Sequence, residues 1–338
     1  MTKEQIDKLI SEGTFPEAAV KPTLVETHIS WIILADHFAY KIKKPVHYSF
    51  LDFSSLEKRK YFCEREIELN KRLTENIYIN VEPVRESAGH YSIGQQEGVI
   101  IDYAVCMQKQ DRTLQMDVLL SNNKVSRDDI YNLAQKIAVF HKNASVLHEI
   151  DLMDIPNKFI DLESEKYFLE KELNNKSRTI ISHAIDISNS FTDKNKRLVA
   201  NRLREGFFRD CHGDLHTRNI FLLPKPQPFD CIEFNDEFRQ IDVLNEVAFL
   251  CMDLDAFERR DLSDLFISFY NDFFPCMRTR EERRLFIYYK SYRANVRAKV
   301  NSLRARSAAN ETVKAAFLKE SYKYLSLMYD YINLLTID

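Results

Sequence analysis

The segment that most constrains this chain is a polar loop sequence followed at once by an apolar run. It reads His-Gly-Asp-Leu-His-Thr-Arg-Asn at residues 212–219, and Ile-Phe-Leu-Leu follows at 220–223. The apolar run predicts a buried β-strand, so Asp214 and Asn219 stand on a loop that a rigid strand holds in place. A carboxylate and an amide oxygen fixed at this spacing are suited to accepting a proton and binding a metal ion.

The same spacing, H-x-D-x-x-x-x-N, occurs in the catalytic loop of kinases. There the aspartate accepts the proton of a substrate hydroxyl, and the asparagine binds Mg²⁺ on the ATP phosphates. We therefore predict that Asp214 is a catalytic base and that Asn219 is a metal ligand. Two alternatives are ordinary turn chemistry at Gly213-Asp214 and a metal triad of His212, Asp214 and His216. No third His or Cys follows at metal-ligand spacing, which disfavours the triad.

Glycine is scarce in this sequence. The chain has 6 glycines among 338 residues, whereas about 7% is usual. Neither G-x-x-x-x-G-K-[ST] nor G-x-G-x-x-G occurs, which excludes P-loop and Rossmann nucleotide sites. Any phosphate-binding loop in this chain must therefore work without glycine.

The bulk properties exclude several classes of protein. A net charge of −3 does not favour general nucleic-acid binding, and the six cysteines are scattered without a C-x-x-C pair. The start of the chain lacks a signal-peptide pattern, and the longest apolar runs fall short of the roughly 18 residues of a membrane span. We expect a reduced, soluble, cytoplasmic protein with no nucleic-acid or membrane partner.

The pattern of apolar residues changes along the chain. A helix is expected at 2–12 and another at 54–73, with β-rich stretches at 23–26, 30–35, 38–44, 91–93 and 99–107. After about residue 110 the spacing is helical, and short strands interrupt it only within 212–242. We predict an α+β fold with a β-rich, nucleotide-binding N-lobe over 1–103. A larger, mainly helical C-lobe over 104–338 carries the catalytic loop and the substrate-binding helices.

A lysine and a glutamate in the N-terminal part meet a further requirement of a kinase. A kinase needs a strand lysine that holds the α/β-phosphates and a helix glutamate that positions this lysine. Lys41 lies in the expected third strand, and Glu66 shares an inward helix face with Phe62, Leu69 and Leu73. A buried carboxylate needs a cationic partner. We predict a Lys41–Glu66 pair; the alternative is a surface lysine and an acid at the edge of the helix face.

A second acidic metal ligand is expected on the strand after the catalytic loop. The stretch 229–235 places Asp230 and Glu233 on opposite faces of a strand. We prefer Glu233, which precedes the turn at the strand end, and keep Asp230 as the alternative. Asp242 and Glu246 fall at a probable helix start, where a structural capping role is expected.

Together these motifs resemble a known superfamily. The chain is similar to the aminoglycoside phosphotransferase and choline-kinase-like superfamily of small-molecule kinases over roughly 25–330. Its H-G-D-x-x-x-x-N motif is more specific than H-x-D alone. Within the superfamily the chain looks closest to an uncharacterised bacterial branch, through motifs at Glu26–Trp31, Tyr40–Pro45, Phe50–Ser54, Phe229–Asn235 and Met252–Leu254. Some members of that branch carry a further C-terminal P-loop ATP-binding domain, for which these 338 residues leave no room.

The resemblance implies a bilobal protein-kinase-like fold and the use of ATP and Mg²⁺. It implies Asp214 as the base, with Asn219 and an acid of 230–233 as metal ligands. One departure is at the metal position, which usually reads I-D-F or I-D-W and here reads Ile-Glu-Phe with Glu233. Because Glu is longer than Asp, the geometry of the metal site is expected to differ.

A second departure is the glycine-free turn between the first two strands, Thr27-His28-Ile29-Ser30. In one interpretation the hydroxyls of Thr27 and Ser30, and the His28 ring, contact phosphate. In the other they only shape the turn.

The segment 278–306 carries ten basic residues against two acids, Glu281 and Glu282. In the expected helix, Tyr289–Leu303, a packed stripe is flanked by basic residues that include Arg293 and Arg297. A solvated basic face is the default interpretation. The functional one is a wall that receives an anionic substrate or partner, with Arg293 and Arg297 as substrate-binding residues. Such a wall would repel a polycationic aminoglycoside.

The leading hypothesis is an ATP- and Mg²⁺-dependent kinase that phosphorylates a hydroxyl of a small molecule, with an anionic acceptor as one option. The alternative is a catalytically weak, kinase-like nucleotide-binding or scaffold protein that holds a partner with its basic helix. A protein kinase is disfavoured because no D-F-G or A-P-E segment occurs. The sequence does not name the acceptor, the preference for ATP over GTP or the oligomeric state.

Overall fold

We describe residues 1–17, 21–150 and 154–336 of the chain in a computed structural model. The chain groups into two compact units. Unit 1 comprises Met1–Leu119 and Arg218–Phe238, and unit 2 comprises Leu120–Thr217 and Arg239–Asp338. Each unit is described separately. The lobe boundary suggested by the sequence, between residues 103 and 104, stays a prediction.

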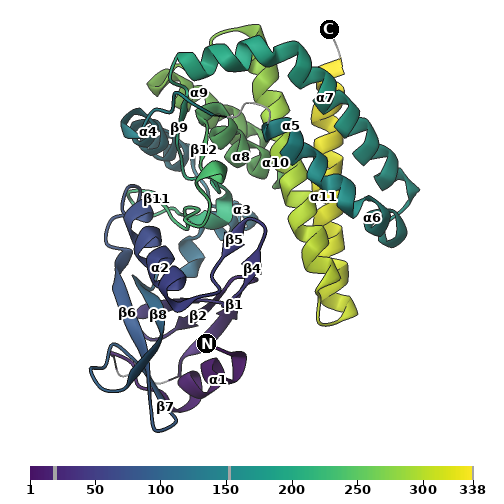
Figure 1. Cartoon of the computed structure of the whole chain (residues 1–338). Coiled ribbons are helices and arrows are strands. Elements are labelled where there is room, and N and C mark those ends of the chain that lie inside the picture. Colours follow the sequence, from purple (N-terminus) through teal and green to yellow (C-terminus); the bar gives the residue numbers. More distant parts are fainter. Residues whose placement is uncertain (18–20, 151–153, 337–338) are drawn as a thin grey trace. The chain divides into compact units, whose positions relative to one another are not determined.

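Unit 1 is built around a curled antiparallel sheet of six strands in the order β1-β2-β3-β8-β6-β7 (Figure 1). Two short hairpins, β4-β5 and β10-β11, accompany it. The strands of unit 1 are β1 (Thr23–Glu26), β2 (Ser30–Leu34), β3 (Phe38–Lys43), β4 (His47–Tyr48), β5 (Leu51–Asp52), β6 (Tyr78–Ser87), β7 (His90–Ile93), β8 (Val99–Gln108), β10 (Ile220–Phe221) and β11 (Gln227–Pro228). The strand predicted directly after Asn219 is therefore present as β10, and β3 lies in the interior of the sheet.

Two helices complete the core of unit 1. In α1 (Lys3–Glu12), Thr2 and Gln5 form a capping box at the start, and Ile6 and Leu9 are fully buried in a cluster that includes residues of the sheet. The helix α2 (Leu56–Asn70) packs on β8 and β6. Its residues Cys63 and Ile67 contact a cluster that includes Val105 of β8. The sheet and α2 therefore share one apolar layer, which fixes the inward face of α2.

The strand β6 is an element that the sequence analysis does not name. Its register against β8 shifts twice, between Tyr78 and Asn80 and between Val84 and Arg85. These bulges break the alternation of buried and exposed side chains that identifies a strand in a sequence. Pro83 adds to the difficulty, because proline is unusual inside a sheet.

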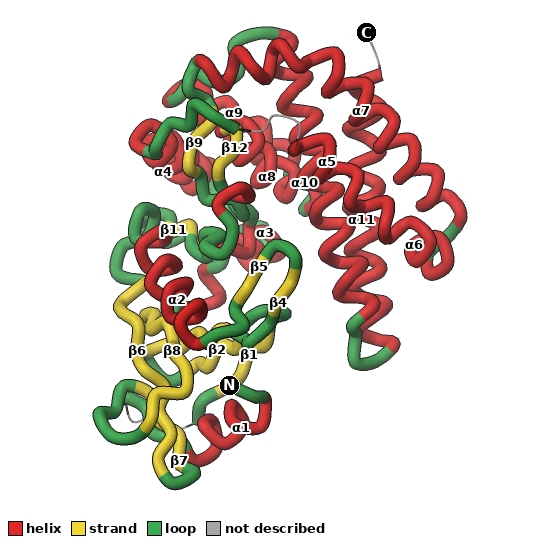
Figure 2. The backbone as a smooth tube through the Cα atoms, viewed as in Figure 1, coloured by secondary structure: helices red, strands yellow, loops and turns green. Residues whose placement is uncertain are grey.

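Unit 2 is mainly helical, as expected (Figure 2). A two-stranded antiparallel pair, β9 with β12, precedes and follows the catalytic-loop segment in the chain. The elements are α4 (Arg127–Asn143), α5 (Asp154–Ile160), α6 (Lys166–Glu172), α7 (Asn175–Arg204), β9 (Phe208–Asp210), β12 (Gln240–Asp242), α8 (Val243–Ala256), α9 (Arg260–Phe273), α10 (Arg280–Arg306) and α11 (Glu311–Thr336). A further helix, α3 (Met116–Ser121), contains the boundary between the units.

Two helices form the centre of unit 2. Every residue of α8 from Val243 to Asp255 is buried, and α10 contacts both α8 and α11. Asp242 caps α8 by accepting a hydrogen bond from the Leu244 amide, which confirms the structural role expected for it. Thr279 and Glu282 form a capping box at the start of α10. A helix that is buried all round must satisfy its polar groups inside the protein.

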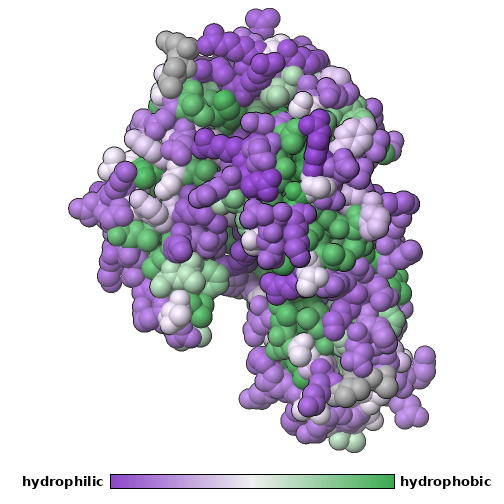
Figure 3. All heavy atoms as spheres, turned by 180° about the vertical axis from the view of Figure 1, so that it is seen from behind, coloured by the Kyte–Doolittle hydropathy of each residue, from purple (hydrophilic) through white to green (hydrophobic). Residues whose placement is uncertain are grey.

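On the face drawn in Figure 3, hydrophilic residues cover much of the surface, and hydrophobic residues show in separate patches. Within the described ranges, no helix combines the length and the apolar character needed to cross a bilayer. The six cysteines all lie in these ranges; they are buried and form no disulfide.

Candidate active site

Two lysines of β3 face the same side of the sheet. Lys41 pairs with Ile32 of β2 and Val105 of β8 across the ladder, and Lys43 pairs with Ser30. Because side chains alternate along a strand, residues 41 and 43 lie on one face. Both are buried, and Lys43 is completely enclosed.

The carboxylate of Glu66 receives both lysines. Lys41 Nζ donates to Glu66 Oε1 at 2.8 Å, and Lys43 Nζ donates to Glu66 Oε2 at 2.7 Å. The predicted Lys41–Glu66 ion pair is therefore present. Burial acts to raise the pKa of Glu66, but the two lysines together lower it below its ordinary value. The glutamate stays ionised, so it can hold both ammonium groups in place.

The two acids after β11 each meet a different lysine. Lys41 Nζ donates to Asp230 Oδ1 at 2.6 Å. Lys43 Nζ donates to Glu233 Oε1 in a short contact. The Asp230 side chain is 43% exposed, whereas that of Glu233 is buried at 4%. Burial raises the pKa of Glu233, against the pull of Lys43.

The expectation that Asp230 and Glu233 lie on opposite faces of one strand is wrong. Residues 229–235 form no strand, because Asp230 adopts a left-handed backbone with φ of 62°. Aspartate tolerates this conformation better than most residues. The Asp230 amide donates to the Tyr78 hydroxyl at 3.1 Å. The kink turns the chain out of the β11 direction and lets the two carboxylates reach different lysines.

Asn219 belongs to unit 1 and lies at the end of the β10-β11 hairpin. The 3₁₀ turn Thr217–Asn219 leads into β10, where Ile220 pairs with Pro228. One step before this pair, the Phe229 amide donates to the Asn219 carbonyl at 2.9 Å. The hairpin therefore brings Asn219 beside the residue that precedes Asp230.

The turn between β1 and β2 is closed by its own hydroxyl. Thr27 Oγ1 accepts a hydrogen bond from the Ser30 amide at 2.9 Å and donates to the Ser30 carbonyl at 3.1 Å. Thr27 is exposed and Ser30 is buried. The Thr27 hydroxyl therefore helps to shape the turn, and phosphate contacts from Thr27 and Ser30 stay a prediction.

In unit 2, the backbone of the loop that is predicted to be catalytic is held from both sides before it reaches Asp214. The carboxylate of Glu246, in the first turn of α8, accepts the His212 amide at 2.6 Å and the Gly213 amide at 3.0 Å. From α10, Arg293 Nη1 donates to the Gly213 carbonyl at 3.2 Å, and its Nε donates to Asn245 Oδ1 at 2.8 Å. These contacts fix the peptide planes on either side of Gly213.

The side chain of Asp214 itself is accessible. It is 37% exposed, and its Oδ2 lies 3.4 Å from Nε2 of His216. Burial acts to raise the pKa of Asp214, but His216, Arg297 and His212 lower it well below the ordinary range. Asp214 is therefore an ionised carboxylate at neutral pH, ready to accept a hydrogen bond from a hydroxyl.

The far end of the loop is fixed by Asp253 of α8. Its Oδ2 accepts hydrogen bonds from the Thr217 hydroxyl at 2.6 Å and the Thr217 amide at 3.0 Å. Its Oδ1 accepts the Tyr324 hydroxyl of α11 at 2.9 Å. Arg297 helps to lower the pKa of Asp253. Both ends of the segment that carries Asp214 are thus anchored to α8.

The basic residues of α10 correct one expectation. Lys290, Arg293 and Arg297 are buried, so the interpretation of a solvated basic face is wrong for these three. Lys290 pairs with Asp255 at 2.6 Å. Arg293 donates to the Gly213 carbonyl, and Arg297 helps to lower the pKa of Asp214 and of Asp253. Leu303, expected in the packed stripe, is 43% exposed. Substrate binding by Arg293 and Arg297 stays a prediction.

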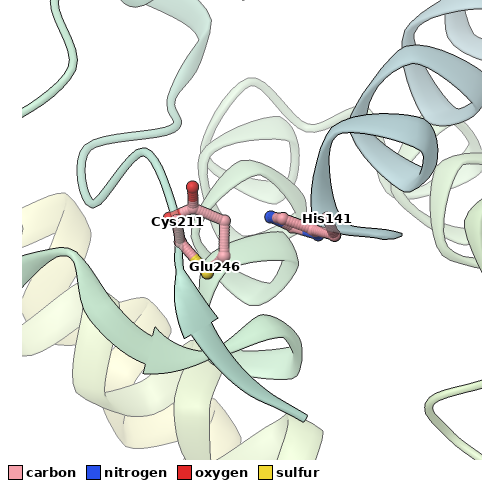
Figure 4. Close-up of side chains that lie close together, drawn as sticks. All are labelled: His141, Cys211 and Glu246. Atoms are coloured by element: carbon pink, nitrogen blue, oxygen red, sulfur yellow. The ribbon is translucent and has the colours of Figure 1, made fainter. Parts of the chain in front are cut away.

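A trio beneath the loop has the composition of a metal site. The ligand atoms of His141, Cys211 and Glu246 all lie within 4.8 Å of one another (Figure 4). Each has protein partners: Nδ1 of His141 contacts the Tyr270 hydroxyl at 2.7 Å, and the Cys211 thiol lies near the Ile241 carbonyl. Glu246 holds the loop amides. We interpret the trio as packing that supports the loop.

Solved structures with similar folds are small-molecule phosphotransferases. A GDP complex of a mutant aminoglycoside 2'-phosphotransferase IIIa matches with a TM-score of 0.55 at 13% identity, covering 96% of this chain and 97% of that chain. The chain has the aminoglycoside phosphotransferase/choline-kinase-like fold. A Plasmodium vivax ethanolamine kinase also matches this fold, with a TM-score of 0.50 at 12% identity over 95% of this chain and 84% of that chain.

Curated relatives with detectable sequence similarity come from mycobacteria. Uncharacterised proteins of Mycobacterium tuberculosis and Mycobacterium bovis are 30% identical over 287 residues, which is 82% of this chain and 54% of each relative. The chain therefore spans about half the length of the curated relatives it matches. No family model matches the sequence.

The supporting roles of three residues were missed in the sequence. The role of Lys43 could have been found, because Lys43 shares the inward face of β3 with Lys41 by simple alternation. Arg293 was considered only for substrate binding and Asp253 only as part of a motif, because their partners in the loop 212–219 are distant in sequence and no local pattern links them. For Glu246 the helix-start position was recognised, but not its contact with the loop.

Proposed function

We propose that this chain is a kinase that transfers the γ-phosphoryl group of ATP to a hydroxyl of a small molecule, with Mg²⁺ as cofactor. The observation that carries the proposal is the Lys41–Glu66 ion pair, on a fold shared with phosphotransferases, in a chain with the H-G-D-x-x-x-x-N loop. Kinase chemistry and the sequence pattern by themselves predict this pair. A buried ion pair that serves only stability is an uncommon choice, because apolar residues of similar size do as well.

The residues have defined roles in this proposal. Lys41, held by Glu66, donates to the nucleotide phosphates. Asp214 accepts the proton as the hydroxyl oxygen bonds to the γ-phosphorus and the bond to the β-phosphate oxygen breaks, releasing ADP. The depressed pKa of Asp214 means that it orients the hydroxyl as a carboxylate and takes the proton late in the transfer.

The donor set fits a magnesium ion. Asn219, Asp230 and Glu233 offer amide and carboxylate oxygens, which are the ligands that Mg²⁺ prefers. Around Lys41 and Lys43 there are three carboxylates, those of Glu66, Asp230 and Glu233, against two ammonium groups. One negative charge is therefore left over. When bound, Mg²⁺ would neutralise charge on the phosphates during transfer.

The proposal is tested by a screen of small-molecule hydroxyl acceptors for release of nucleoside diphosphate, with and without Mg²⁺. GTP is run beside ATP, because similar aminoglycoside phosphotransferases were crystallised with GDP. We expect at least one acceptor to stimulate release, and only with Mg²⁺. A chain that neither binds ATP or GTP nor turns them over would contradict the proposal.

A further inference from the structure

We propose that Lys43 is a positioning residue whose ammonium group pairs with the Glu233 carboxylate and keeps that carboxylate from binding the metal ion. Asp230 is then the acid that binds the metal ion, together with Asn219. This inference rests on the proposed function and deepens it. By position in the motif, Glu233 would be the expected metal ligand, because it stands where related sequences carry the Asp of I-D-F. The inference assigns the metal ion to Asp230 instead.

The environment of Lys43 is that of a fixed internal cation. Its side chain is completely buried, and its Nζ contacts Glu66 Oε2 and Glu233 Oε1. The ammonium also lies 4.9 Å from the centre of the Phe53 ring, where a cation–π contact adds stabilisation. Removing a buried ammonium from two carboxylates is costly. Lys43 therefore neutralises the Glu233 carboxylate, as a bound metal ion would otherwise do.

Asp230 differs from Glu233 in its exposure and in the lysine that it contacts. Its side chain is 43% exposed, and the nearby ammonium is that of Lys41, which the nucleotide phosphates are expected to engage. Asp230 follows Phe229, whose amide bonds to the Asn219 carbonyl at 2.9 Å. Asn219 therefore lies opposite the residue that precedes Asp230, whereas Glu233 lies three residues beyond Asp230.

The charges favour the same assignment. Glu66 is shared by two lysines, Glu233 is paired with the buried Lys43, and Asp230 is paired with Lys41 at the exposed end of the group. The extra methylene of a glutamate at position 233 gives it the reach to Lys43. A metal ion at Asp230 would meet an exposed carboxylate whose lysine the nucleotide phosphates are expected to engage, whereas a metal ion at Glu233 would compete with a buried lysine.

The test is metal binding, measured by electron paramagnetic resonance of Mn²⁺ with the whole chain and ADP, without any acceptor. The variants are Asp230→Asn, Glu233→Gln, Lys43→Met and the double variant Lys43→Met/Glu233→Gln. We expect Asp230→Asn to weaken Mn²⁺ binding by roughly tenfold or more, and Glu233→Gln to change it by less than about threefold. Lys43→Met exposes an uncompensated Glu233 and should tighten Mn²⁺ binding, and the double variant should return it to the wild-type value.

The double variant also protects the test against misfolding, because it removes both members of the buried pair at once. The reverse pattern, with Glu233→Gln weakening Mn²⁺ binding tenfold and Asp230→Asn leaving it unchanged, would overturn the inference. So would a wild-type chain that binds no Mn²⁺ with ADP. Since no acceptor takes part, failure of the acceptor screen leaves this measurement standing.

Discussion

At the scale of single residues, the candidate site of unit 1 is an alternating series of charges. It runs Asp230, Lys41, Glu66, Lys43, Glu233, with each neighbouring pair in contact. Burial alone would lower the pKa of Lys41, but Asp230, Glu66 and Glu233 raise it well above its ordinary value. Lys41 is therefore an ammonium at neutral pH.

Replacing Lys41 by alanine should weaken nucleotide binding without unfolding unit 1. Lys43 still neutralises Glu66 in this variant, so the loss is that of a charge-assisted hydrogen bond to phosphate, about 1.5–3 kcal/mol, or roughly 10–100-fold in Kd. Isothermal titration with Mg-ATP measures the effect. Lys60→Ala is the matched control, because Lys60 is a half-exposed lysine of α2 in a surface pair. Equal Kd values for the two variants would remove Lys41 from the nucleotide site.

At the scale of elements, one helix organises the catalytic loop of unit 2. α8 supplies Glu246 to the amides before Asp214 and Asp253 to Thr217 after it. The start of a helix carries partial positive charge, which suits acidic side chains there. Even so, complete burial raises the pKa of Glu246 from 4.5 to about 7, in spite of Arg293 and the two amides.

This shift predicts a specific dependence of stability on pH. Because the pKa of Glu246 is higher in the folded state, its contribution is complete below pH 4.5 and is lost as pH rises through about 7. At 1.36 kcal/mol per pKa unit, the loss amounts to about 3 kcal/mol. Glu246→Gln cannot titrate, so its unfolding free energy should rise relative to wild type between pH 5 and pH 8.

Urea unfolding of both proteins at several pH values measures this difference. Titrating groups that the two proteins share cancel in the comparison. A difference between wild type and Glu246→Gln that is constant from pH 5 to pH 8 would show that the Glu246 carboxyl titrates as in the unfolded chain.

Local patterns in the sequence predicted many of the elements, but they missed β6, suggested a strand at 229–235 that is absent, and did not give every buried face. The Lys41–Glu66 pair was predictable because the two-residue alternation of a strand places Lys41 inside and the spacing of apolar residues along a helix places Glu66 inside. The segment 229–235 was taken for a strand because its residues alternate, and a single left-handed residue, Asp230, ended that alternation. The sequence pattern did not predict that Arg293 lies on the buried face of α10. Its partner is a loop carbonyl 80 positions away in the chain, which no local pattern indicates.

At the scale of the whole molecule, one buried arginine joins three elements of unit 2. Arg202 of α7 makes two hydrogen bonds to Asp242, the cap of α8, at 2.6 Å and 2.8 Å. It also donates to Glu282 of α10 at 2.8 Å and to the Cys276 carbonyl at 2.7 Å. If the arginine is removed, Asp242 loses a buried cationic partner, whereas Glu282 still pairs with Arg278 at 2.7 Å.

Arg202→Leu should therefore destabilise the protein by about 3–5 kcal/mol, the usual cost of breaking a buried ion pair from one side. Thermal and urea unfolding measure the loss. The control is Arg204→Leu, an exposed position on the same helix, for which a change within about 0.5 kcal/mol is expected. A loss for Arg202→Leu no larger than the control would mean that the network contributes little to the fold.

The most direct test of the central claim is phosphoryl transfer by Asp214→Asn, with the acceptor that the screen identifies. Asparagine keeps the size of the side chain but cannot take a proton as a carboxylate does. We predict that kcat and kcat/KM fall together by roughly 10²–10⁴-fold, while the Kd for Mg-ATP and the melting temperature stay near those of wild type. A folded Asp214→Asn protein that keeps more than about a tenth of the wild-type kcat would contradict the account.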